Sequence, residues 1–129
     1  MHIKVTELIG KTLTEVKVNG DKDEILFTAD DGKQWRMYHC QDCCESVTIE
    51  DIVGDLGDLI GSPIVMAEEV IHEGENPEGV PSKTYQDSFT WTFYKFATIK
   101  GYVTIRWYGD SNGYYSESVD FEEINNQED

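Results

Sequence analysis

The sequence predicts an α+β domain in which antiparallel β-sheets dominate and one short helix is present. Three observations lead to this class. Segments rich in aromatic and β-branched residues, which favour strands, fill the last third of the chain. Asp31-Gly32 separates two strand-like segments, which is a strong signal for a tight hairpin. Apolar residues recur at helical spacing over residues 48–60.

The chain has the length of one domain. With 129 residues it can bury enough apolar surface to fold without disulfides, so we expect a single domain over residues 1–129. Residues 72–88 contain all but one of the three prolines and few apolar side chains, which predicts a mobile loop rather than a linker. Residues 125–129 predict a polar tail that need not be ordered.

The N-terminal segment predicts a turn followed by a strand. Residues 5–10 fit a short turn or a single helical turn that ends at Gly10. Residues 13–19 alternate in the manner of a half-buried strand, and we expect Val16 and Val18 to face inward.

A hairpin follows, with strands at residues 25–29 and 34–39 on either side of Asp31-Gly32. If these two residues form the whole turn, both faces of the hairpin carry apolar side chains. The predicted pairs are Asp30 with Lys33, Thr28 with Trp35, Phe27 with Arg36, Leu26 with Met37 and Ile25 with Tyr38.

The middle of the chain predicts the short helix. Apolar positions over residues 48–60 follow a helical period, although Gly54 and Gly57 interrupt it. Residues 61–63, Gly-Ser-Pro, end this helix, and residues 64–73 predict a further strand.

The last third predicts a three-stranded meander over residues 89–99, 102–108 and 114–121. A two-residue turn at Lys100-Gly101 sets the register of the first two strands. One face is then an apolar core face, on which the pairs are Thr98 with Val103, Phe96 with Ile105 and Tyr94 with Trp107. The opposite face pairs Ala97 with Thr104, Lys95 with Arg106 and Phe93 with Tyr108, and the loop 109–113 brings Tyr114 and Ser116 alongside.

The predicted pairing of Lys95 with Arg106 suggests a binding site. Like charges opposite each other in a sheet are destabilising unless a negative group lies between them. That group is either one of the protein's own carboxylates or a bound phosphate or nucleotide, for which the neighbouring aromatic rings offer stacking surfaces. The candidate ligand-binding residues are Arg106, Lys95, Asn112, Tyr108, Tyr114 and Phe93, with Arg36 and Tyr38 of the first hairpin as secondary candidates.

The loop after this hairpin offers a second feature for an anion. Residues 109–113, Gly-Asp-Ser-Asn-Gly, are of types that accept left-handed backbone angles and turn amides outward, as an anion nest does, although most such loops only reverse the chain.

Three cysteines lie within five residues, at Cys40, Cys43 and Cys44. Adjacent cysteines rarely bridge one another, so we expect reduced thiols in a cytoplasm. Cys40 and Cys43 beside His39 have the spacing of zinc ligands, but the second ligand pair is missing, so the alternative of thiols packed at a strand end is preferred. We expect neither a metal nor a cofactor.

No conventional catalytic centre is evident. Cys43 or Cys44 with His39 or His72 is the combination that offers a nucleophile and a base, and no motif supports it. Gly-rich phosphate loops of the Walker or Rossmann type do not occur. We therefore expect binding rather than turnover.

The formal charge of −16 narrows the choice of partners. Such a charge repels nucleic acid and anionic membranes, keeps the protein soluble, and favours basic partners or concentrated cations. No apolar run approaches the roughly 18 residues of a membrane span, and no signal peptide is recognisable, so we expect the protein to stay in the cytoplasm.

Four blocks of the sequence, at residues 38–47, 59–64, 101–108 and 111–115, resemble a family of small phage-encoded proteins of unassigned function. The order of a Leu-Ile-Gly opening, a central cysteine block and a terminal Ser-Asn-Gly-Tyr-Tyr hairpin is also similar to the Thoeris anti-defence sponge family. Those proteins hold cyclic ADP-ribose isomers without turnover, in sites shared between protomers. The resemblance implies a homo-oligomeric trap for a cyclic immune signalling nucleotide in the host cytoplasm.

A second function follows from the acidity. In this alternative, the protein is an acidic interaction protein or a nucleic-acid mimic that inhibits a basic host protein. The carboxylates of residues 68–78 and 110–128 would imitate phosphates.

Overall fold

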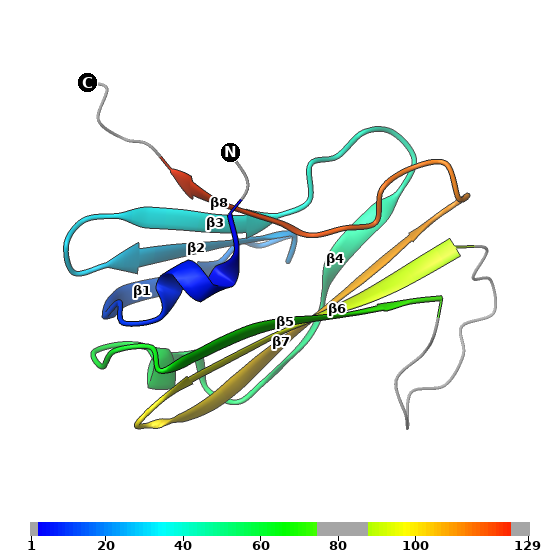
Figure 1. The fold of residues 1–129 in the computed structure, drawn as a ribbon. Coiled ribbons are helices and arrows are strands. Elements are labelled where there is room, and N and C mark those ends of the chain that lie inside the picture. The colour runs from blue at the N-terminus through cyan, green and yellow to red at the C-terminus, as the bar shows by residue number, and fades with distance from the viewer. Residues whose placement is uncertain (1–2, 75–87, 125–129) are drawn as a thin grey trace, which may run out of the picture.

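The computed structural model describes residues 3–74 and 88–124, which form two antiparallel sheets of four strands packed face to face (Figure 1). Sheet A has the strand order β1-β2-β3-β8, and sheet B has the order β4-β7-β6-β5. The strands are β1 (Leu13–Val18), β2 (Glu24–Ala29), β3 (Gln34–Tyr38), β4 (Ser46–Val53), β5 (Met66–Glu73), β6 (Ser88–Thr98), β7 (Gly101–Ser111) and β8 (Asp120–Ile124). Two short 3₁₀ turns, η1 (Val5–Leu8) and η2 (Leu56–Leu59), are the helical elements of the described chain. The predicted helical turn near the N-terminus is confirmed, and so is the first strand, whose Val16 and Val18 pack against the core.

The predicted α+β class is wrong in one respect, because residues 48–60 do not form a helix. They continue β4 and then make the single turn η2. A β-bulge at Glu50 explains the misleading pattern, since it adds one residue to β4 between Ile49 and Asp51. Ile49 and Ile52 therefore both face the core at a spacing of three, which imitates a helical period. Antiparallel sheet is confirmed, and the described chain is all-β.

The first hairpin forms where it was predicted, but its register differs by one residue. The loop holds three residues, 30–32, and Gly32 at its end has a φ of +88°. The N–H of Ala29 donates to the carbonyl of Lys33, which closes the loop. Phe27 therefore pairs with Trp35, and both side chains are buried on the inner face.

The hairpin of β6 and β7 is also confirmed, with its register shifted by two residues. The turn residues are Ile99-Lys100, and Thr98 pairs with Gly101. The hydroxyl of Thr98 accepts the N–H of Lys100 and holds this turn. A shift of two keeps every side chain on its predicted face but changes its neighbour, so Lys95 opposes Thr104.

The third strand of the predicted meander does not join the second. β8 is short and pairs with β3 of sheet A instead of β7. Phe121 of β8 packs edge-on against Phe27, with ring centroids 5.9 Å apart, and this core contact accounts for the change of sheet. The neighbour of β7 on its other side is β4.

One core lies between the sheets. Phe27 of sheet A meets Phe96 of sheet B at 5.9 Å between ring centroids. The indole N–H of Trp107 donates to the sulfur of Met37 at 3.3 Å, across the same interface. η1 packs beside β5 and contributes Leu8, which is fully buried.

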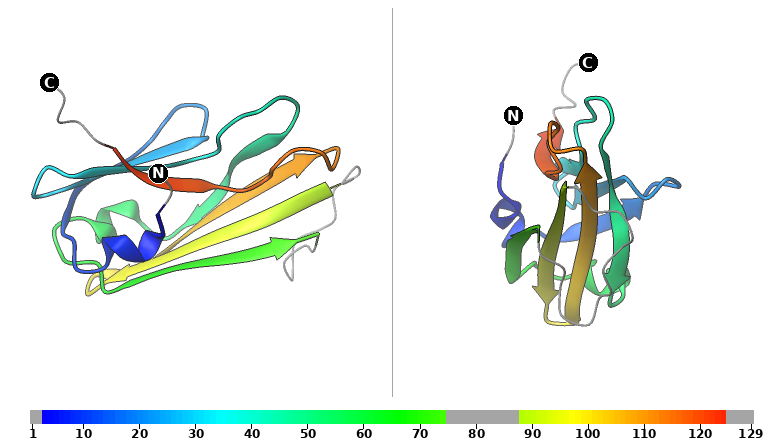
Figure 2. Two further views of the ribbon diagram at one scale, coloured as in Figure 1. Left: turned by 45° about the horizontal axis from the view of Figure 1, so that its top comes forward. Right: turned by 90° about the vertical axis from the view of Figure 1, so that its right-hand side faces the viewer.

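The edges of the sandwich position the candidate site. β5 and β8 are edge strands on one side, and β1 and β4 are edge strands on the other (Figure 2). The predicted mobile loop falls mostly outside the described residues, but 72–73 belong to β5 and 88 to β6; the predicted tail at 125–129 lies entirely outside them. Within the part of the chain that the structure describes, no helix has the length and apolar character needed to cross a membrane.

Candidate functional site: an acidic cleft between the sheets

An open cleft of about 750 Å³ lies between sheet B, at its edge strand β5, and the connection that leads from sheet B to sheet A. Its volume falls in the range that proteins use for small ligands. The inner faces of β5 and β6 form one wall, and residues 115–118, which lead from β7 to β8, form the other. The lining includes Ile71 and Glu73 of β5, Thr90 and Thr92 of β6, and Ser116 and Glu117 of the connection.

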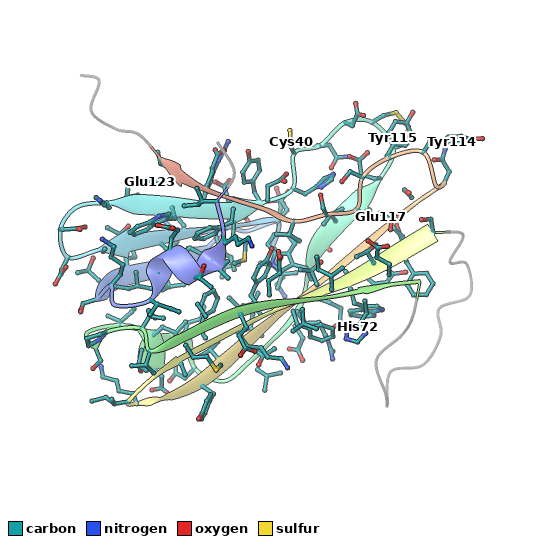
Figure 3. The ribbon with its side chains drawn as sticks, viewed as in Figure 1. Cys40, His72, Tyr114, Tyr115, Glu117 and Glu123 are labelled. Carbon is teal, nitrogen blue, oxygen red and sulfur yellow. A yellow bond between two sulfur atoms is a disulfide. The ribbon has the colours of Figure 1, made fainter. Side chains whose placement is uncertain are left out.

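Glu117 forms part of the cleft wall and is only 8% exposed. Figure 3 shows it projecting from the connection toward β6. The hydroxyl of Thr90 donates to Oε1 at 2.8 Å, and the hydroxyl of Ser111 donates to Oε2 at 2.6 Å. Neither donor carries a formal charge. Among the described residues, no ion pair balances this buried carboxylate.

Other carboxylates share this side of the sandwich. We call Glu69, Glu73, Glu117 and Glu123 the acidic side, because Glu69, Glu73 and Glu123 occupy inward-facing positions of the edge strands β5 and β8 and Glu117 lies on the connection that leads into β8. The hydroxyl of Tyr94 donates to Glu69 at 2.6 Å, and burial together with this carboxylate raises the pKa of Tyr94. Inward-pointing charges also protect edge strands from pairing with other chains.

The face predicted to bind an anion is the outer face of sheet B. It does hold Phe93, Lys95, Arg106 and Tyr108 together, but the predicted pairing of Lys95 with Arg106 is wrong, since Arg106 opposes Phe93. Arg106 donates from Nε and Nη2 to Oε1 of Glu50 at 2.9 and 2.6 Å.

Asp51 adds a third contact to Arg106, at 3.7 Å. The alternative considered from the sequence, a carboxylate of the protein itself, is therefore the one found beside Arg106. Lys95 lies between Thr104 and Glu68 in the register, where no second cation faces it.

The aromatic residues of this face cover one another. Trp91 is fully buried although it lies outside the main core, with its ring 4.7 Å from that of Tyr108. Arg106 lies over the Trp91 ring at 5.4 Å, and His72 meets Phe93 edge-on. Tyr108 is buried in this cluster, so its ring is not a free stacking surface.

The remaining predicted residues lie elsewhere. The side chain of Ser111 accepts the N–H of Gly113, so one amide of the predicted anion nest is already bound, and the side chain of Asn112 accepts the N–H of Tyr114 just beyond it. Tyr114 is 87% exposed and does not reach sheet B's outer face as predicted; Figure 3 shows it pointing into solvent.

Arg36 and Tyr38 belong to β3 of sheet A, whereas the cluster around Arg106 belongs to sheet B, so the two groups are on different sheets. The guanidinium of Arg36 stacks on the ring of Tyr38 at 3.8 Å and donates to Glu122 at 2.8 Å. The two arginines of the chain are thus both paired with carboxylates.

The cysteine loop contains a buried hydrogen-bonded pair. His39 Nε2 lies 2.6 Å from Glu45 Oε2, and its Nδ1 lies 2.7 Å from the carbonyl of Ser118. The hydrogen bond from His39, with the backbone N–H groups of Cys43 and Asp42, lowers the pKa of Glu45 to about 2. Glu45 thereby ties the loop to the core and to the segment that leads into β8.

The expectation of three reduced thiols is wrong, because Cys43 and Cys44 form a disulfide and Cys40 alone is free. The structure therefore offers no thiol at either predicted nucleophile. His39 is held by Glu45, and His72 packs on Phe93. No group of three or more His, Cys, Asp or Glu side chains that could hold a metal lies within residues 3–74 and 88–124.

Glu117 was missed as a single residue by sequence reasoning, which grouped it with all the acids of 110–128. A signal was present, since Glu117, Val119 and Phe121 alternate with polar residues. A period of two places the three on one face, and all three are buried.

In the described residues, the fold and the cleft define an all-β sandwich with an acidic cleft beside the edge strand β5. The chain belongs to the family of the domain of unknown function DUF7448, whose family model matches residues 6–121. Comparisons with curated proteins and with solved structures found no match. The family match itself gives no link to phage proteins or to Thoeris sponges.

Proposed function

We propose that this domain acts by binding rather than by turnover, and that its partner presents positive charge. The observation that supports this most strongly is the distribution of ion pairs. Arg36 and Arg106 are held by the protein's own carboxylates, whereas Glu117 is buried at the cleft and pairs with no cation among the described residues. A buried charge without a counter-charge is costly, and a positively charged guest would offset that cost.

The overall charge points in the same direction. The chain has 26 Asp and Glu against 10 Lys and Arg, so most carboxylates have no basic residue of the chain to pair with. A field of this sign accelerates association with basic proteins and opposes association with phosphate-rich ligands. This favours the acidic interaction protein over the nucleotide trap.

The test is recovery of a partner from cell lysate, with two charge-matched variants. Glu73→Lys with Glu123→Lys reverses two exposed positions of the acidic side; Glu15→Lys with Asp21→Lys makes the same charge change elsewhere. We expect the wild type and the second variant to recover the same basic protein, in a complex that salt dissociates, and the first variant to lose it. Recovery of no basic protein, or equal loss by both variants, would contradict the proposal.

Sequestration of a cyclic nucleotide is the second candidate, with a homo-oligomer as its expected state. It is supported by the sequence resemblance and by the shared face of Phe93, Arg106 and Tyr108. A phosphate at this place has to displace Glu50 from Arg106. Glu50→Gln should then strengthen binding of a cyclic nucleotide panel, and Glu122→Gln, which frees Arg36 on the other sheet, should not. Mass spectrometry of the denatured complex distinguishes an unmodified ligand from a product.

A further inference from the structure

We propose that the cleft between sheet B and the connection 115–118 is a binding site for an ammonium or guanidinium group, anchored by the carboxylate of Glu117. This inference deepens the proposed function and rests on it for the sign of the ligand's charge. It adds the place, the anchoring residue and the chemical class of the group that enters.

The hydrogen bonds of Glu117 leave room for such a group. An ionised carboxylate has about four lone-pair sites. The hydroxyl of Ser111 has one proton, and the 2.6 Å contact to Glu117 is much shorter than its 3.3 Å contact to the carbonyl of Tyr115, so that proton goes to Glu117. Thr90 supplies the other proton, one for each oxygen. About two acceptor sites are therefore left on a residue that lines the cleft.

A cationic donor suits these free sites better than a neutral one. Hydrogen bonds from ammonium or guanidinium to carboxylate are roughly twice as strong as neutral ones, and they also balance the buried charge. Glu73 lies on the same lining and adds a second negative group near the mouth of the cleft. Both arginines of the chain have carboxylate partners elsewhere.

The rest of the lining fits an organic cation rather than a metal ion. Tyr115 lines the cleft, and aromatic rings attract organic cations. Ser88, Thr92 and Ser116 add neutral polar groups that can accept further N–H donors. A divalent metal ion prefers several carboxylate or carbonyl ligands together, and the described residues include no such group.

The entering group has two sources, a free amine or the side chain of a Lys or Arg in a protein. Both present the same chemistry to Glu117, so separate probes are needed. Spermidine and agmatine represent free amines. Capped pentapeptides of alanine with a central Lys, Arg or norleucine represent the side chains, and norleucine is the uncharged control.

The experiment is titration of ¹⁵N-labelled full-length protein, followed by amide chemical shifts. We expect saturable shifts at residues 88–92 and 115–118 with at least one cationic probe, and none with the norleucine peptide. Glu117→Gln should weaken binding by about tenfold or more, because it removes the charge and keeps the shape. Glu68→Gln is the matched control, since Glu68 lies on the same edge strand as Glu73 but on the outer face; its affinity should equal that of the wild type.

A second variant covers the case in which Glu117→Gln does not fold. Ser116→Lys places a tethered ammonium at an exposed position of the lining, and it should also weaken binding of the cationic probes by about tenfold. Shifts that never saturate, or equal weakening by Glu68→Gln, would overturn the site. The two proposals can fail separately. If the wild type and Glu117→Gln recover the same basic protein equally well, the cleft proposal is wrong and the proposed function stands. If free amines bind in the cleft but no basic protein is recovered, the cleft proposal stands and the proposed function is wrong.

Discussion

Arg106 and Glu50 are joined by two hydrogen bonds, from Nε and Nη2 of the guanidinium to the same Oε1 of the carboxylate. The bulge in β4 creates this contact, because Glu50 is the extra residue that has no partner in the ladder. The arginine beside the aromatic cluster of sheet B is thereby neutralised by the protein's own carboxylate. Because Arg106 already has a carboxylate partner, this face is less suited to an anionic ligand, and the acidic side is the stronger candidate for binding.

The Arg106–Glu50 pair should contribute modestly to stability. Its side chains are 23% and 36% exposed, so solvent screens the attraction. A double-mutant cycle with Arg106→Gln and Glu50→Gln should give a coupling energy of about 1 kcal/mol or less by urea unfolding. A coupling well above that range would contradict the partly screened geometry.

Gly54 should tolerate alanine poorly. Its φ is +108°, and an added Cβ would lie 2.5 Å from the carbonyl oxygen of Tyr102, an atom of the backbone. Gly113 has a similar φ of +97° with nothing within 4 Å, so it is the matched control. We expect Gly54→Ala to lower the free energy of unfolding by about 3 kcal/mol and Gly113→Ala by about 1 kcal/mol. Equal losses would show that crowding at Gly54 has no effect.

Glu45 should make stability depend on acid pH. Its pKa falls from 4.5 to about 2 on folding, so the ionised carboxylate stabilises the fold above pH 4.5. That contribution is lost as the pH drops from about 4.5 toward 2. Glu45→Gln removes it, so the wild type should be the more stable protein at pH 6 and the difference should shrink toward pH 2.5. Urea unfolding at several pH values measures this, and parallel curves would contradict it.

The cysteines can be counted directly. In protein purified in air and denatured without reductant, a thiol reagent should find one thiol per chain, that of Cys40. After reduction it should find three, because the Cys43–Cys44 disulfide opens. Three thiols before reduction would restore the expectation drawn from the sequence.

Local sequence signals predicted most of the strands, but not which strands and residues pair with one another. Asp31-Gly32 located the first hairpin, yet the register depended on Gly32 taking a left-handed conformation at the end of a three-residue loop. Likewise, the turn at Ile99-Lys100 is set by the side chain of Thr98, which a count of turn residues does not include. A shift of two residues was enough to separate Lys95 from Arg106.

Features that depend on long-range contacts were harder still to predict from the sequence. The bulge at Glu50 changes a strand's period from two to three at one point, and a single sequence does not mark it. β8 does not join the meander, because Phe121 packs in the core beside Phe27. This contact depends on long-range packing and not on the local sequence. Glu117 was within reach, since it shares its period with Val119 and Phe121.

The central claim, that the ligand is positively charged and unchanged by binding, is tested most directly by offering both charge classes together. Saturation-transfer difference NMR of the full-length protein with spermidine, agmatine and a panel of cyclic nucleotides reports binding and chemical change in one sample. We expect transfer to a cation, none to the nucleotides, and no new products. Transfer to a cyclic nucleotide without transfer to any cation, or the appearance of a modified ligand, would contradict the claim.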